Sequence, residues 1–461
     1  MELKLNKRRT FLIAVMFAAI LMLWQVYNQY VPIFLDELLK ARSNRPLEFY
    51  ENYPHHYAHI IGTIMSLDNL SGILIIPLFS WLSDRTNSRM GRRMPYMVFG
   101  SILSLILFPL IAAMFLWNAF VWYFVIVAML VIAMGTFRTP AVAIMPDITP
   151  KPLRVQANAI INFIGYVGAI LGGGLVMLIS FMPGSSSDSV LEIMNASNSF
   201  LHIIPFLATS LVLMAVILLF LFKFKENKVV HEMKAELQEG EKQSETHAVV
   251  QEDKPLSKRD KINFGIIIAA VFFCWFAFGA LQPWGSTYSR HILGNHGYWA
   301  MLSISLAVAS LAAFLPSIWL TKRIGRKWSV VLGLAIVLLA LVPGAIWGAA
   351  GGIALLIPLF LLSGIGWAFV MVSSFPMFLE MASPKNVGKV TGLYYLVSQG
   401  AMLLTANASG WLFRSVGYDF YFWYATIFMA IALVICLFYK PRPVSGELST
   451  TSQNQTQAQE S

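Results

Sequence analysis

Charged residues are scarce in this chain of 461 residues: Asp, Glu, Lys and Arg make up 12% of it, against 57% hydrophobic residues. A water-soluble domain of this length needs more charge than that to cover its surface. The apolar residues also fall in continuous runs of about 20 or more, which are long enough for helices to cross a bilayer and lack the alternation of barrel strands. The composition therefore excludes a soluble protein and predicts one that crosses the membrane many times.

Cysteine is nearly absent as well. Cys274 and Cys436 each lie inside an apolar run, so we expect neither a disulfide framework nor a thiolate metal site. His55, His56 and His59 lack the spacing of metal ligands, and no nucleophile is paired with a base in the pattern of a catalytic site. We therefore expect no metal, no cofactor and no enzyme activity.

The few charges are unbalanced, with a net charge of +10. In a soluble protein this excess would suggest nucleic acid, but in a membrane protein it is typical of cytoplasmic loops rich in Lys and Arg. No nucleic-acid partner is expected. Basic residues gather in alternate loops, at residues 7–9, 85–93, 151–154, 223–262, 322–327 and 385–389. The positive-inside rule therefore places these loops and both termini in the cytoplasm.

Twelve membrane spans are expected from the apolar runs. The first follows the basic start MELKLNKRRT but is too long for the core of a signal peptide, so we expect it to remain as a helix. The expected spans lie at about residues 11–34, 58–82, 95–115, 120–144, 156–181, 200–222, 263–285, 298–320, 328–348, 352–378, 390–413 and 419–439.

An internal repeat divides these spans into six and six. WLSDRTNSRMGRR follows the second span and WLTKRIGRK follows the eighth, while MPDITPKPLRVQANA and FLEMASPKNVGKVTG follow the fourth and the tenth. We therefore expect an all-α membrane protein with two pseudo-symmetric six-helix bundles, residues 1–222 and 263–439. Residues 223–262 are expected to form a charged cytoplasmic linker and residues 440–461 a disordered cytoplasmic tail.

The loop after the second span resembles that of the major facilitator superfamily. The D-R-x…G-R-R pattern and its echo after the eighth span carry this resemblance. DRTNSRMGRRMP, then Arg138 in GTFRTPAVAIMPD, then ANAIINFIGYVGAILG is also similar to the sucrose and maltose proton symporters of the glycoside–pentoside–hexuronide:cation symporter group. The sodium-coupled melibiose carriers have paired aspartates where this chain has Gly72 and Ile76. The resemblance thus implies the major facilitator fold and coupling to protons rather than sodium.

The same loop is predicted to be part of a cytoplasmic gate. Gly91 permits a tight turn, Asp84 can accept from the N-terminus of a neighbouring helix, and Arg92 or Arg93 can pair with Asp147. Such pairs would close the cytoplasmic side and break when the transporter opens inward, although static pairs that stabilise the fold are the alternative. The expected gate residues are Asp84, Gly91, Arg92, Arg93 and Asp147, with Arg326 and Glu380 at the equivalent places of the second half.

Two ionisable residues lie deep in the expected spans. Asp68 is about ten residues into the second span, which places it some 15 Å down, near the midplane. A carboxylate there is costly, and such residues usually face the bundle interior and serve ion or proton pathways. Arg138, in the fourth span, has a forked set of donors suited to sugar hydroxyls or a carboxylate. We expect Asp68 and Arg138 to couple proton movement to transport. The alternatives are a structural aspartate that caps Asn69 and an arginine that extends to the cytoplasmic surface.

Polar and aromatic side chains recur at helical spacing along several spans. Amides can bond sugar hydroxyls and aromatic rings can stack on a sugar face, although bonds between helices or an interfacial aromatic belt would produce similar stripes. The expected substrate-binding residues are Trp24, Tyr27, Asn28, Arg138, Asn158, Asn162, Gln282, Trp284, Tyr395 and Gln399.

The sequence thus predicts a multi-pass monomer in the plasma membrane, such as a bacterial inner membrane. It is expected to be a secondary active transporter that imports a disaccharide or another glucoside together with protons, by alternating access. Its partners would be the lipid bilayer, a small neutral sugar and the proton. A drug or lipid exporter on the same fold, and a sugar receptor that signals without transporting, remain alternatives.

Overall fold

The computed structural model describes residues 4–182, 199–247, 257–380 and 386–440, and these residues form helices without a strand. The predicted tail lies outside the described residues, apart from residue 440. The α-helices are α1 (Lys7–Ala41), α2 (Leu47–Asn52), α3 (Ala58–Arg85), α4 (Met94–Leu116), α5 (Phe120–Ile148), α6 (Arg154–Ser180), α8 (Ile204–Lys223), α9 (Glu226–His247), α10 (Lys258–Leu293), α11 (Gly297–Ile324), α12 (Arg326–Leu379), α13 (Val387–Val416) and α14 (Tyr421–Phe438). Short 3₁₀ turns precede α6, α8 and α14, at Lys151–Leu153, Ser199–Ile203 and Tyr418–Phe420.

The predicted all-α membrane fold is confirmed. Ten helices among the described residues are long and apolar enough to cross a membrane, as helices must be when the bilayer offers no partners for backbone groups. One of them, α12, has 54 residues and would span about 80 Å if straight. Its chain turns at Gly352, whose φ of 55° is not helical, so α12 contains two spans. Because α12 contains two spans, the ten helices provide eleven. The 30-residue helix α13 is the twelfth, so the number matches the twelve expected spans.

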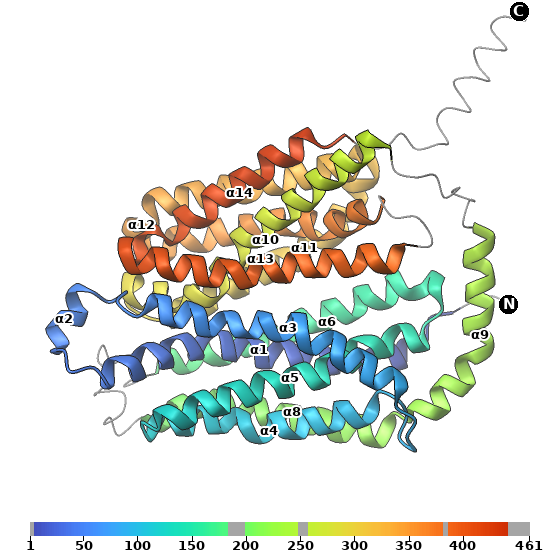
Figure 1. Ribbon diagram of the computed structural model, residues 1–461, viewed down its shortest axis with the longest axis horizontal. Helices are drawn as coiled ribbons and strands as arrows, with labels where there is room; N and C mark the ends of the chain where they lie inside the picture. The colour runs from blue at the N-terminus through green and yellow to red at the C-terminus, as the bar shows by residue number, and fades with distance from the viewer. Residues whose placement is uncertain (1–3, 183–198, 248–256, 381–385, 441–461) are drawn as a thin grey trace, which may run out of the picture.

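The helices pack as two bundles that lie side by side (Figure 1). In the N-terminal bundle α1 packs on α6 and α4 packs on α5 and α8, while in the C-terminal bundle α10 packs on α13 and α14, and α11 on α12. α2 lies at one end of the molecule and α9 at the other (Figure 1). We call these the α2 end and the arginine end, since residues 85–93 lie beside α9 at the latter.

Close helix packing inside the N-terminal bundle depends on small residues. A Cβ on Gly168 of α6 would lie 2.1 Å from the carbonyl oxygen of Ala18 on α1. Side chains are excluded at such a crossing, so the two backbones approach more closely than larger residues would allow. A larger residue than glycine at position 168 would force α1 and α6 apart.

The two bundles touch each other at the α2 end. Ser180 of α6 hydrogen-bonds His296 beside α11 at 2.8 Å, and Thr63 of α3 hydrogen-bonds Asn407 of α13 at 3.3 Å. The seam reaches the middle of α1, where Gln25 Nε2 donates to Ser303 Oγ at 2.8 Å. Within the described residues, every hydrogen bond and ion pair between the bundles lies between this level and the α2 end.

Toward the arginine end the bundles separate. α3 and α13 converge at the α2 end and diverge from there (Figure 1). The contacts between the two helices that can be placed, the Thr63–Asn407 hydrogen bond and the ring contact of His59 with Trp411, lie in the part of α13 near the α2 end. The bundles are therefore joined at the α2 end, and their helices are further apart at the arginine end.

Candidate functional site

A cluster of aromatic and charged side chains occupies the middle of the N-terminal bundle. α1 contributes Trp24 and Tyr27, whose ring centroids are 5.4 Å apart. α5 contributes Arg138, whose guanidinium carbon lies 5.9 Å from the centroid of the Trp24 ring. α3 contributes Asp68, which interacts electrostatically with both Tyr27 and Arg138. Four of the predicted site residues, on three helices, are thus brought together.

The charges of Asp68 and Arg138 are not neutralised by ion pairs with other described residues. Asp68 Oδ1 accepts from its neighbour Asn69 at 2.8 Å, and no ion pair joins Asp68 to Arg138 among the described residues. Arg138 likewise makes no hydrogen bond or ion pair within the described part of the chain. The buried Nε1 of Trp24 also has no hydrogen-bond partner in the described part of the chain. Unpaired polar groups at this depth are costly unless water or a solute satisfies them, so the cluster is chemically suited to binding.

The C-terminal bundle approaches the same cluster through α13. Tyr395 interacts electrostatically with Arg138 across the gap between the bundles. A Cβ on Gly72 of α3 would lie 3.1 Å from Gln399 Oε1, which places that amide one turn of α3 beyond Asp68. The predicted residues Tyr395 and Gln399 therefore face the cluster from the second bundle, at the point where the bundles begin to separate.

Other predicted binding residues are not joined to the cluster. Asn28, Asn162 and Gln282 are partly exposed and Asn158 is exposed, and no hydrogen bond or ion pair links any of them to Asp68 or Arg138 among the described residues. These amides stay predictions.

Trp284 needs a correction in this conformation. Its side chain is fully buried and its Nε1 donates to Ser409 Oγ at 2.8 Å within the C-terminal bundle. Its ring also lies beside Gly62 and Gly410, where α3 crosses α13 near the α2 end. The indole is therefore occupied in packing the seam and has no free face for a solute.

The arginine-rich loop folds around Arg93. Its Nη2 lies 2.6 Å from Asp84 Oδ1, its Nε lies 3.0 Å from Asp147 Oδ2, and Arg92 Nη2 lies 3.8 Å from the same oxygen. Burial alone would lower the pKa of Arg93, but the Asp147 and Asp84 carboxylates outweigh it and raise that pKa above its ordinary value. The predicted pairing of Arg92 or Arg93 with Asp147 is present, and so is a 2.6 Å pair between Arg326 and Glu380.

The proposed gating role of these pairs does not follow from their positions. Arg93 and Asp147 both belong to the N-terminal bundle, and Arg326 and Glu380 both belong to the C-terminal bundle. All of the pairs are formed although the bundles are apart at this end, so they do not have to break for it to open. In this conformation they tie loops to helices inside each bundle, as the alternative interpretation expected.

Glu226, the first residue of α9, has the role that the sequence assigned to Asp84. Its carboxylate accepts from the backbone N–H groups of Arg92, Arg93 and Met94, at 2.9 to 3.1 Å, and so caps the N-terminus of α4. Gly91 has a φ of 118°, and a Cβ there would lie 2.2 Å from Glu226 Oε2. Glycine at this position therefore makes room for the carboxylate as well as permitting the turn.

We expect Glu226→Ala to destabilise the protein by about 2 kcal/mol, because three backbone amides at the start of α4 lose their acceptor. A thermal unfolding scan of the detergent-solubilised protein would show this as a lower midpoint. Glu232→Ala is the matched control from the same helix: Glu232 is 42% exposed and pairs with Arg9, so its loss should cost less than about 0.5 kcal/mol. Equal midpoints for the two variants would contradict the capping role.

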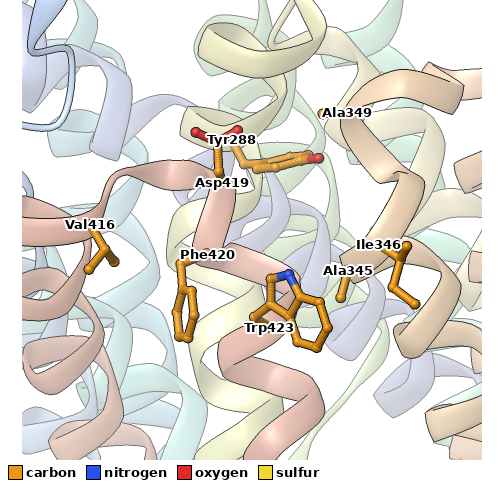
Figure 2. A pocket seen from close by; sticks show the side chains of 9 residues that line it. Tyr288, Ala345, Ile346, Ala349, Val416, Asp419, Phe420 and Trp423 are labelled. Atoms are coloured by element: carbon orange, nitrogen blue, oxygen red, sulfur yellow. The ribbon is translucent and has the colours of Figure 1, made fainter.

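A separate cavity of about 380 Å³ lies in the C-terminal bundle near the α2 end. Figure 2 shows Tyr288 of α10, Ala345 and Ile346 of α12, and Phe420 and Trp423 around it. Asp419 is the charged residue in its lining, and none of the predicted site residues takes part. This cavity is therefore distinct from the central cluster, which we regard as the candidate solute site.

Residues 16–439 match a family model described as MFS/sugar transport protein. The chain belongs to this family of the major facilitator superfamily. Its members are transporters rather than enzymes, and a secondary transporter is what two bundles around a central polar cluster would form. No curated protein sequence matches the chain.

Solved structures of the superfamily share the fold. A D-xylose–proton symporter has 13% identity and a TM-score of 0.65, with 95% of this chain and 98% of that chain covered. An inward-open xylose transporter XylE from E. coli has 14% identity and a TM-score of 0.63, with 95% and 97% covered. The nucleoside transporter NupG has 14% identity and a TM-score of 0.60, with 93% and 98% covered. At such identities these structures show the fold of the chain alone.

Proposed function

We propose that this transporter imports a small neutral sugar, such as a disaccharide or another glucoside, together with a proton. The observation that carries the proposal is that Asp68 and Arg138 interact electrostatically deep in the spans while neither forms an ion pair among the described residues. A carboxylate there can bind and release a proton, and an arginine fork can bond sugar hydroxyls. Trp24, Tyr27, Tyr395 and Gln399 would provide aromatic faces and further hydrogen bonds around the solute.

A neutral solute fits this cluster better than a charged one. The cluster contains one carboxylate and one guanidinium, so its formal charges balance and neither sign is in excess. A multiply charged solute would need several buried charges of opposite sign to replace its hydration. The family description and the D-xylose–proton symporter among the structural neighbours support a sugar substrate and proton coupling, without establishing either for this chain.

We place the arginine end in the cytoplasm, following the positive-inside rule. The structure would then be the inward-facing state, which can release solute to the cell interior. A proton that moves inward through 100 mV supplies about 2.3 kcal/mol, which is sufficient for more than tenfold accumulation of a neutral solute.

The proposal predicts that purified protein in liposomes accumulates a labelled glucoside or disaccharide when the outside is made acidic. A panel of such sugars should show uptake at least about tenfold higher with the pH gradient than without it. Efflux of drug-like dyes that sugars do not affect would favour an exporter instead. Binding without flux would favour a receptor.

A further inference from the structure

Two ion pairs join the bundles at the α2 end. Glu37 Oε1 lies 2.6 Å from Arg290 Nη1, and Asp36 Oδ2 lies 3.5 Å from His291 Nε2. Consecutive residues of α1 thus meet consecutive residues of α10. Lys40, one turn further along α1, lies 2.6 Å from Asp36 Oδ2. Among the described residues, these two pairs are the ion pairs that cross from one bundle to the other.

The Glu37–Arg290 pair is enclosed by the seam. The side chain of Glu37 is 1% exposed and that of Arg290 is 12% exposed. Among the described residues, neither Glu37 Oε2 nor the hydroxyl of Ser286, one turn before Arg290, has a hydrogen-bond partner. A buried ion pair usually contributes little net stability, because removing both charges from water offsets their attraction. The pair is therefore better suited to specifying one arrangement of the bundles than to stabilising the fold.

The Glu37–Arg290 pair differs from the other arginine–carboxylate pairs in joining two bundles. The Arg326–Glu380 pair has the same 2.6 Å separation but lies inside the C-terminal bundle. It can stay intact whichever end of the molecule is open. Glu37 and Arg290, in contrast, have to part when the bundles separate at the α2 end, since each belongs to a different bundle.

We propose that Glu37 and Arg290 form a lock that holds the α2 end of the transporter closed, and that this pair parts and becomes hydrated in each transport cycle. Loss of one partner leaves the other charge buried and unpaired in the closed state, but in the open state water hydrates that charge. Neutralising either residue therefore destabilises the closed state selectively. This inference depends on the two-bundle transport fold and not on the identity of the solute or coupling ion.

The experiment uses a cysteine at Ser286 as a reporter. Ser286 is fully buried and lies four residues before Arg290, on the same face of α10. The native Cys274 and Cys436 are both buried, which keeps background labelling low. A membrane-impermeant maleimide is applied from the α2 end of vesicles with known orientation, and the labelling rate is measured without solute.

We expect Glu37→Gln to raise the labelling rate at least tenfold over the parent, and Arg290→Gln to do the same from the other bundle. The charge-exchanged protein, Glu37→Arg with Arg290→Glu, should label at a rate close to that of the parent, because the pair is restored. This rescue distinguishes a lock from a general loss of folding, because a misfolded single variant would not be repaired by a second substitution.

Glu380→Gln is the matched control, since it breaks an Arg–Glu pair of equal length inside one bundle. It should leave the labelling rate within twofold of the parent. The proposal is overturned if the single neutralising variants label no faster than the parent, if Glu380→Gln accelerates labelling equally, or if charge exchange fails to restore protection.

Discussion

Asp68→Asn is expected to abolish accumulation of solute against a gradient while leaving exchange of solute across the membrane at a comparable rate. An amide has nearly the size of the carboxylate and can still accept a hydrogen bond through its oxygen, but it cannot take up a proton and release it. The solute would then move without the proton that drives it. Uptake at an imposed pH gradient should fall at least about tenfold, to the level reached without the gradient.

Two measurements on the same liposomes check this expectation: net uptake driven by a pH gradient, and exchange of internal unlabelled solute for external labelled solute. Asp419→Asn is the matched control, because Asp419 is an exposed acid at the separate cavity and should leave both activities unchanged. If Asp68→Asn still accumulates solute at the parental rate, Asp68 does not couple the proton.

Gly62→Leu is expected to slow both accumulation and exchange severely. A Cβ on Gly62 of α3 would lie 2.3 Å from the carbonyl oxygen of Ala406 on α13, and a backbone atom cannot move aside as a side chain can. The substitution should therefore prevent the bundles from meeting at the α2 end. If overpacking costs the closed state about 3 kcal/mol, exchange should slow about a hundredfold.

Exchange kinetics in liposomes check this, together with solute binding by the purified protein, which should persist. Gly265→Leu provides the control, since Gly265 also lies in a helix but a Cβ added there would meet no atom within 4 Å. Near-normal exchange by Gly62→Leu would show that the α3–α13 contact does not have to form during the cycle.

The expected spans follow from sequence because each apolar run is a local feature. The division of α12 is marked by GAAGG, where Gly352 turns the chain, and the depth of Asp68 follows from helical rise along α3. The pairing of Arg93 with Asp147 can also be predicted from the sequence, since both lie near the ends of neighbouring spans on the same side of the membrane.

The contacts that the sequence does not predict are those set by packing between distant segments. Glu226 accepts a hydrogen bond from the amide of Arg92, 134 positions away in the chain. The linker contains many acids, and no local pattern distinguishes Glu226 from the others. Glu37 and Arg290 meet because α1 packs against α10, which no local pattern in either span indicates. Trp284 follows Gln282 by two residues in the same span, but the crossing of α3 and α13 buries its ring.

The central claim is that one acid in the membrane, Asp68, exchanges a proton as a neutral sugar crosses between the two bundles. Simultaneous recording of labelled sugar and lumenal pH in liposomes tests it most directly, with no initial pH gradient. We predict that each sugar taken up is accompanied by about one proton in the parent, and by none in Asp68→Asn. Sugar entry into parental liposomes with no change in lumenal pH would contradict the account.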